Sequence, residues 1–334
     1  MAQMAAELGL SRIAVSAVVN GRTRQARVSE STARRVREHL TKRGYVPSRN
    51  ACHLRTAPAR VIGIMHIGKI FSHLIEAFHK LVENLHGAAQ GLEIIMTPLD
   101  RIESAVREAR ARRVTDLVWI HNSHAGEEYR EGYISQYLVN MRTIIYNFPF
   151  DSPLGEKDLL DHGVSLVGVD RTVHLNRLAR LLKQLGHRVI VLPNATRGNG
   201  NTRYYEAFEK AGLVVADFPP SFSVDEMRKA MKEHGVTAAC FHGDSPACLA
   251  LSELRAAGIR VPEDLTVTGF DGMSKSYNSD LTTLVIPIEK MVSKIQEIIS
   301  GAEQKQRHCF DLELVKGRTH GPAAEGRGMR EVEG

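Results

Sequence analysis

From about residue 60 onward, the hydrophobic residues fall into short runs rich in Ile and Val, separated by longer amphipathic stretches. Such runs are typical of buried strands, and apolar spacing of i, i+3 and i+4 is typical of helices. Alternation of the two predicts an α/β fold with doubly wound parallel sheets, in two lobes. Strands are expected at 61–65, 92–96, 116–120, 143–147 and 165–169, and in a second set at 189–193, 214–218, 237–241 and 265–270. Helices are expected at 74–85, 102–112, 172–185, 202–211, 224–234 and 246–257.

The first 45 residues carry a different pattern, which predicts three short helices. The first helix runs from the N-terminus to about Leu8, and the glycine that follows supplies a turn. Ser11 is a good N-cap for the second helix. In that second helix the apolar residues Ile13, Val15 and Val18 can face inward.

The third helix of this segment has its own start and stop signals. Asn20-Gly21 ends the second helix in a turn, Ser29 caps the third, and Gly44 stops it. Helix, glycine turn, helix, loop and helix is the layout of a helix-turn-helix module. The sequence therefore predicts an all-α DNA-binding head.

In a helix-turn-helix, the N-terminal end of the second helix enters the major groove. Here that end carries Arg12, which can bond guanine O6 and N7, and Ile13, which can touch a thymine methyl group. The other arginines and the helix N-termini are expected to hold phosphates. The residues predicted to contact DNA are Ser11, Arg12, Ile13, Ser16, Asn20, Arg27, Ser29, Arg49, Ala51, Leu54 and Arg55.

The charge distribution supports a nucleic-acid partner for this head. Residues 1–60 carry twelve Arg and Lys against three Glu, a net charge of +9, whereas the whole chain of 334 residues has a net charge of +6. The rest of the chain is therefore mildly acidic. A basic end on an acidic body is expected where one end meets phosphates.

The head resembles the DNA-binding domain of the lactose-repressor (LacI) family. The matching segments are MAAELGLSRIAVSAVVNG and VSESTARRVREHLTKRGYVPSRNACHLR. The resemblance implies a hinge helix after GYVP that opens the minor groove, with Ala51 beside it and Leu54 as the apolar wedge. Two features depart from the family: Ala17 stands where an arginine usually reads a base, and the chain begins unusually close to the first helix.

The resemblance returns at residues 165–285, in LLKQLGHRVIVL, AACFHGDSPACLALSELRAAGIRVPEDLTVTGFDG and DLTTLVIP, the last taken as a crossover back to the first lobe. It implies a two-lobed, periplasmic-binding-protein-like sensor behind the head. The predicted boundaries are 1–45 for the head, 46–59 for the hinge, 60–170 with 287–309 for the N-lobe, 171–286 with 310–318 for the C-lobe, and 319–334 for a disordered tail.

Ligands of open α/β sheets bind beyond the carboxyl ends of the strands, which here is the cleft between the lobes. Asp271 is the strongest candidate, because the family uses this GFD aspartate on effector hydroxyl groups. The resemblance implies that the effector is a sugar or a related metabolite. Tyr204 stands where many sugar-binding relatives carry an arginine, with Arg203 beside it, so either the effector is not a standard sugar or Arg203 serves in place of that arginine. The residues predicted to bind effector are Asp271, Asp244, Asn199, Asn201, Arg203, Tyr204, His66, Lys69, His121 and Asn122.

Several other classes of protein are not favoured. No apolar run reaches the length of a membrane span, and the N-terminus lacks a signal-peptide pattern, so a cytoplasmic protein is expected. The cysteines form no CxxC pair, no complete catalytic motif occurs, and neither a metal nor a cofactor is predicted. The sequence predicts a homodimeric, effector-controlled regulator, by family habit a repressor, on a near-palindromic operator. A solute-binding protein or a sugar-active enzyme of the same layout is the alternative.

Overall fold

The computed structural model describes residues 2–19, 23–42, 60–68, 70–86, 91–97, 102–122, 135–138, 141–151, 155–195, 202–273, 280–301 and 305–324. The chain forms two compact units, Met1–Ala59 and Arg60–Gly334. We call the first unit the head and the second the body. None of the helices in the described ranges is long and apolar enough to cross a membrane.

In the described part of the head, three helices pack around a small apolar core. Both predicted caps are confirmed: Ser11 Oγ accepts the amide of Ala14 at 3.1 Å, and Ser29 Oγ accepts that of Thr32 at 3.2 Å. Each cap satisfies an amide that the first turn leaves without a partner. The helices are α1 (Ala2–Leu8), α2 (Arg12–Val19) and α3 (Glu30–Lys42), and the core consists of Met4, Ala5, Val15, Val18, Ala33 and Val36.

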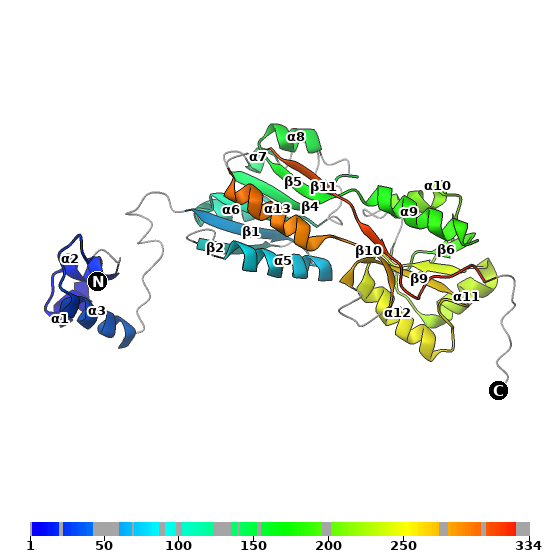
Figure 1. The fold of residues 1–334 in the computed structure, drawn as a ribbon, viewed down its shortest axis with the longest axis horizontal. Helices are drawn as coiled ribbons and strands as arrows, with labels where there is room; N and C mark the ends of the chain where they lie inside the picture. The colour runs from blue at the N-terminus through cyan, green and yellow to red at the C-terminus, as the bar shows by residue number, and fades with distance from the viewer. Residues whose placement is uncertain are drawn as a thin grey trace. The chain divides into compact units, whose positions relative to one another are not determined.

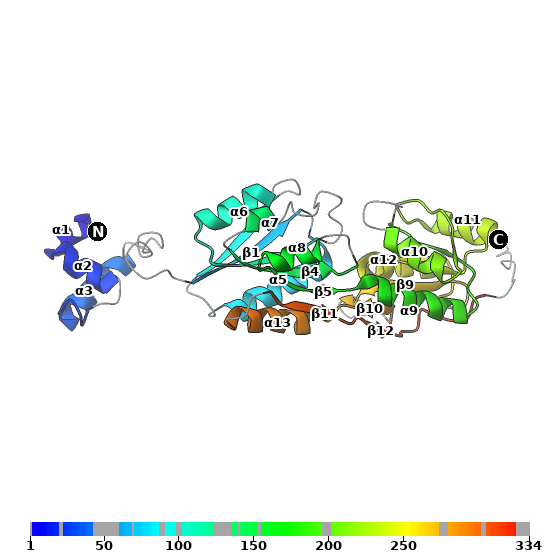
Figure 2. The same cartoon turned by 90° about the horizontal axis from the view of Figure 1, so that it is seen from above.

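The N-lobe of the body is a parallel sheet with helices on both faces (Figures 1 and 2). Its order in the described residues is β11-β5-β4-β3-β1-β2, so β2 is an edge strand. One apolar cluster joins the sheet to α5 and α13, and another joins it to α6, α7 and α8. The strands are β1 (Val61–Ile67), β2 (Gly91–Thr97), β3 (Asp116–Ile120), β4 (Arg142–Pro149), β5 (Ser165–Val169) and β11 (Arg307–Phe310). The helices are α5 (Ser72–Leu85), α6 (Ile102–Ala111), α7 (Ser135–Leu138), α8 (Glu156–Asp161) and α13 (Ile288–Ser300).

The C-lobe repeats this layering around a second sheet, of order β12-β10-β9-β8-β6-β7. Helices α9 and α10 pack on one face, and α11 and α12 on the other. Its strands are β6 (Val189–Val191), β7 (Val214–Val215), β8 (Ala238–Cys240), β9 (Thr266–Asp271), β10 (Thr282–Val285) and β12 (Glu313–Val315). Its helices are α9 (Arg171–Gln184), α10 (Thr202–Lys210), α11 (Val224–His234) and α12 (Asp244–Ala256). The α/β fold with two doubly wound sheets is thus confirmed, and every strand pair that the structure describes is parallel except β10 with β12.

Two expectations from the sequence need correction. Residues 282–285, expected to form only a crossover, are strand β10, which pairs with β9 and with the antiparallel β12. Residues 319–324, expected to be disordered, are ordered against the C-lobe: Thr319 is fully buried and donates to the carbonyl of Val267 at 2.7 Å. The Thr and His side chains of this segment form hydrogen bonds to β9 and β10, which its sequence alone does not reveal.

The first described residue of the body is tied firmly into the N-lobe. Arg60 donates to both carboxylate oxygens of Asp116, at 3.0 and 2.9 Å, and to the carbonyl of Ile299 near the end of α13. Arg142 donates to the carbonyl of Gly301 at 2.7 Å. Cations at a helix C-terminus satisfy its last carbonyls and complement its dipole. The first described residue of the body is therefore fixed to the N-lobe sheet and to the end of α13.

Candidate functional site

The N-terminal end of α2 presents the side chains expected to read DNA. Ser11, Arg12 and Ile13 are exposed. Ile13 is 76% exposed, so the expectation that it faces inward is wrong. Val15, two residues later, is fully buried and supplies the inward contact instead. An exposed isoleucine at the start of a helix gains nothing from the head's own core. It is suited to an apolar contact with a partner.

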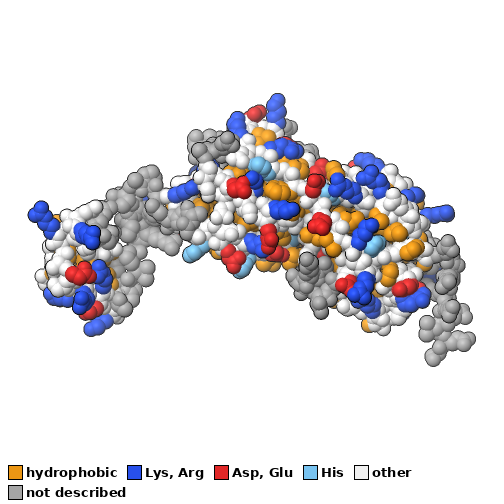
Figure 3. Space-filling view, in the orientation of Figure 1, with side chains coloured by type: hydrophobic (Ala, Val, Ile, Leu, Met, Phe, Trp, Pro, Cys, Tyr) orange, Lys and Arg blue, Asp and Glu red, His pale blue; other side chains and the backbone are white. Residues whose placement is uncertain are grey.

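Exposed basic side chains are spread over the described part of the head, and several Lys and Arg side chains are visible in Figure 3. Arg27 lies in the turn after α2 with a positive φ of 51°. Arg35 has a structural role as well, since it donates to the carbonyl of Leu8 at 3.2 Å and so closes the end of α1. The exposed basic residues of the described head are Arg12, Arg24, Arg27, Arg34, Arg35, Arg37 and Lys42.

Some predicted DNA-contacting positions have less accessible surroundings or cannot be described. Ser16 is half-buried, and Ala17 is buried against the head. The predicted positions Asn20, Arg49, Ala51, Leu54 and Arg55 lie outside the described residues. The hinge assignment therefore stays a prediction.

In the body, the carboxyl ends of the N-lobe strands bring several predicted residues together. His66 on β1 contacts the carbonyl of Ile120 through Nδ1 at 3.0 Å. His121 and Asn122 follow β3 directly and are buried. His66, His121 and Asn122 thus lie together at the carboxyl ends of neighbouring strands of one sheet, as the strand-end rule predicts.

A strained residue of β4 lies beside them. Asn147 has a positive φ of 64° at a break in the β4–β5 register, and its side-chain amide donates to the carbonyl of His121 at 3.0 Å. Its side-chain oxygen accepts from Arg171, the first residue of α9, at 2.6 Å. Bulges and unusual backbone angles in non-glycine residues concentrate at functional sites.

The sequence prediction missed Asn147 and Arg171. Arg171 comes two residues after β5 ends, so the same strand-end rule selects it. Its position in an amphipathic helix, however, gave no sign that the side chain is buried.

The two lobes meet through charged and polar side chains. Arg203 of α10 donates to Asp151, which follows β4, with 2.7 Å between Nη1 and Oδ1. The other oxygen of Asp151 accepts from the amide and the hydroxyl of Thr172, both at 3.1 Å. Tyr204 is buried beside Arg203, edge-on to Phe270 with 5.9 Å between ring centroids.

A second bridge between the lobes involves Asp271. Asp271 ends β9 with φ of 101°, and its Oδ2 lies 3.7 Å from Nδ1 of His73 on α5. Nearby, the hydroxyl groups of Ser72 and Ser245 are 3.1 Å apart. A polar junction of this kind can bind a ligand on both sides and respond to lobe movement.

Asp244 occupies a different environment from the other predicted residues. It is fully buried at the start of α12 and accepts from the hydroxyl of Thr283 at 2.6 Å. A Cβ added at Gly269 would lie 2.2 Å from its Oδ1, so this carboxylate packs against β9. Because it is engaged inside the C-lobe, we leave it out of the site proposed below. Asn199, Asn201 and Lys69 lie outside the described residues.

Burial sets the protonation of several groups at this junction. It lowers the pKa of His121 to about 3, with Arg171 and Arg203 adding repulsion, so the imidazole is neutral. Burial also lowers the pKa of His242 and raises that of Tyr204 to about 12. The junction is thus lined by neutral hydrogen-bonding side chains around a few permanent charges.

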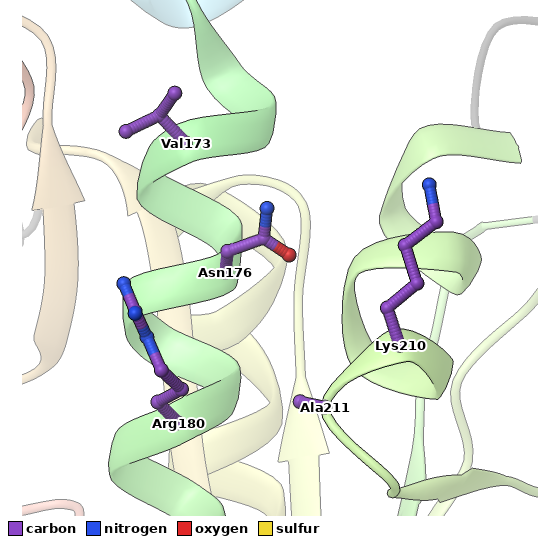
Figure 4. Close-up of a pocket in the computed structure, with 5 residues that line it drawn as sticks. All are labelled: Val173, Asn176, Arg180, Lys210 and Ala211. Atoms are coloured by element: carbon purple, nitrogen blue, oxygen red, sulfur yellow. The ribbon is translucent and has the colours of Figure 1, made fainter.

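A separate hollow of about 320 Å³ lies between α9 and α10 (Figure 4). It is lined by Val173, Asn176, Arg180, Lys210 and Ala211, and no side chain among them is buried. It therefore lacks the desolvated polar groups that fix a ligand's orientation.

Comparisons with known proteins cover almost the whole chain. Residues 179–318 match the model of the periplasmic binding protein-like domain. An HTH-type transcriptional regulator of Mycolicibacterium smegmatis is 26% identical over 97% of each chain, and the HTH-type transcriptional repressor PurR of Aliivibrio salmonicida is 26% identical over 90% of each. The crystal structure of the lac repressor dimer bound to operator and the anti-inducer ONPF is similar in fold, with a TM-score of 0.67, 16% identity and coverage of 95% of this chain and 97% of that one.

Proposed function

This chain belongs to the LacI family of transcriptional regulators, and from that premise we propose that it is a repressor whose operator affinity is set by a small molecule bound between the lobes. It is a DNA-binding regulator and not an enzyme. The observation that carries the proposal is the exposed N-terminal end of α2, with Arg12 and Ile13, on the same chain as a two-lobed sensor.

The head contacts DNA in two ways. Arg12 and Ile13 read base edges in the major groove, while Arg27 and the other exposed arginines hold phosphates. In the hinge, Leu54 wedges between base steps of the minor groove, as the family resemblance implies. Leu54→Ala should then weaken operator binding and reduce DNA bending, and unchanged values of both would remove the wedge from the mechanism.

Two chains dimerise, and an apolar surface of the N-lobe is suited to that contact. Ile94 and Met96 are exposed on the edge strand β2. They lie on the same face of the strand as Leu92, which packs with α5, and Ile75 of α5 is exposed as well. Exposed apolar side chains on a sheet edge are a surface that a partner usually covers. We call Ile75, Ile94 and Met96 the α5–β2 surface. A two-fold dimer then reads a near-palindromic operator.

The effector binds among Asp271, Tyr204, Arg203, His66 and His121, which come from both lobes. A ligand held by both lobes favours one degree of closure. A change in lobe closure changes the position of the paired hinges on the DNA. Coupling of this kind is typically about 1–3 kcal/mol and must be reciprocal, so operator binding changes effector affinity by the same factor.

The test is selection from a random DNA duplex pool, comparing the full chain with a truncation that starts at Arg60. The full chain alone should recover a palindrome, with affinity that falls steeply as salt rises. Enrichment by the truncated body, or no enrichment by the full chain at any salt concentration, would contradict the proposal.

A further inference from the structure

Arg171 is a buried cation with donor capacity left over. Its residue is 3% exposed, and its Nη2 donates to the neutral amide oxygen of Asn147 at 2.6 Å. Its Nη1 is buried and has no hydrogen-bond partner among the described residues. A buried donor without a partner is costly, and more so on a charged group.

The charged residues that the structure describes around Arg171 do not neutralise it. The charged neighbours that act on it are Arg203, also positive, and Asp151. Asp151 uses one oxygen on Arg203 and the other on Thr172. One carboxylate therefore faces two guanidinium groups, and these three side chains together carry one excess positive charge. Burial accordingly lowers the pKa of Arg171, although a guanidinium remains protonated in proteins.

A neutral donor lies beside this cation. The hydroxyl of Tyr146, on the strand that carries Asn147, is buried and has no hydrogen-bond partner among the residues described. His121 is close enough to Arg171, Arg203 and His66 to be influenced by all three. A guanidinium edge with a neutral O–H donor beside it matches the acceptors of a carboxylate or a phosphate.

We infer that the effector carries an oxyanion, and that Arg171 binds this group, with Arg203 beside it. The inference rests on the proposed function, because it names the chemical class of the ligand of that same site. A neutral sugar would use the free donor but leave the excess charge buried. An oxyanion satisfies both requirements at once.

The first test uses inorganic phosphate as the probe, and measures the melting temperature of the full chain at constant ionic strength. We expect a saturable rise for the natural protein that is absent in Arg171→Gln, because a ligand that binds only the folded state stabilises it. General stabilisation by excluded phosphate acts on both proteins alike. Without phosphate, Arg171→Gln should melt at the same or a higher temperature, since it removes an unneutralised buried charge.

Arg180→Gln is the matched control. Arg180 lies on the same helix but is exposed and lines the α9–α10 hollow of Figure 4. The Arg180→Gln variant should keep the saturable rise in melting temperature with phosphate. The inference is overturned if the natural protein gives no saturable rise, if Arg180→Gln rather than Arg171→Gln abolishes it, or if Arg171→Gln melts far below the natural protein, which would make Arg171 structural.

The second test asks which oxyanion is bound. Hexuronates and hexose 6-phosphates are each compared with the neutral parent hexose by calorimetry. A member of one acidic series should bind, and Arg171→Gln should weaken it by about 10- to 100-fold, the range for losing a charge-assisted hydrogen bond. A neutral hexose that binds as tightly as its acid would overturn the inference. Operator binding by the natural protein is measured separately without effector, so failure of the regulator proposal and failure of this inference give different results.

Discussion

Arg12 and Arg24 are both exposed arginines of the head, yet their positions give them different roles. Arg12 is the first residue of α2, where side chains reach base edges, whereas Arg24 lies in the turn that follows the helix. A bidentate arginine–guanine contact discriminates between bases, and a phosphate contact does not.

Arg12→Ala should therefore cost about 1–3 kcal/mol of operator binding and relax the base preference at one position of each half-site. Arg24→Ala should weaken binding to all sequences alike and reduce the salt dependence by about one counterion. Affinities for the selected operator and its single-base variants, over a salt series, separate the two. Equal sequence preference in Arg12→Ala and the natural protein would contradict base readout by Arg12.

His121 makes the stability of the body depend on pH. Its pKa is lowered to about 3 when folded, against an ordinary value of 6.5, so the unfolded chain takes up a proton that the folded chain does not. The free energy of unfolding is therefore unaffected above about pH 7 and falls as pH drops below 6.5, by up to about 1.4 kcal/mol per pH unit for this residue.

Urea unfolding between pH 7.5 and 5 measures this effect. His121→Gln should flatten the decline, whereas replacing the exposed His79 of α5 removes no buried group and should leave it unchanged. An identical slope in His121→Gln and the natural protein would mean that His121 is not the source.

At the scale of elements, α3 depends on its first turn. Ser29 Oγ accepts the amide of Thr32 and donates to the hydroxyl of the same residue. Val36, one turn further on, is fully buried in the head's core. A small core buries little apolar surface, so the cap contributes a larger share of the free energy of unfolding here than in a large domain.

Ser29→Ala should destabilise the head by about 1 kcal/mol, since it removes an N-cap. Because only the folded head binds operator, the readouts are head unfolding followed by hydrogen exchange in α3, and operator affinity. Ser29→Thr keeps the hydroxyl group and should restore most of both. If the alanine and threonine variants exchange at the same rate, the cap does not limit α3.

At the scale of the whole molecule, the α5–β2 surface predicts how two chains meet. Its apolar side chains are exposed in the single chain, and a charge placed there would be buried without a partner in a dimer. The same charge costs little in the monomer, where water covers the strand edge.

Ile94→Glu with Met96→Glu should convert the dimer to monomers at micromolar concentration and reduce operator affinity by at least tenfold, because one head reads only half of the site. Val214→Glu is the control, since Val214 is also exposed and lies on β7, an edge strand of the other sheet. Sedimentation velocity gives the oligomeric state. A double variant that stays dimeric would place the interface elsewhere.

The sequence by itself determined the features that depend on neighbouring residues. Ser11 and Ser29 cap their helices as predicted, because an N-cap bonds an amide only three residues away. The buried strands β3 and β5 begin and end where their apolar runs do. The strand-end rule also placed His66, His121 and Asp271 at the carboxyl ends of their strands, because the direction of each strand fixes where its last residues lie.

The tertiary structure alone decided which polar groups are buried and what they face. Arg171 and Arg180 look alike in the sequence of α9, yet one is buried against Asn147 and the other is exposed. Asp244 and Asp271 both adjoin strands of the C-lobe, yet one bonds Thr283 inside that lobe and the other faces His73 across the junction. The partners of these side chains lie tens of residues away in the chain. Local periodicity carries no information about such contacts, because they form only when two sheets and two lobes are assembled.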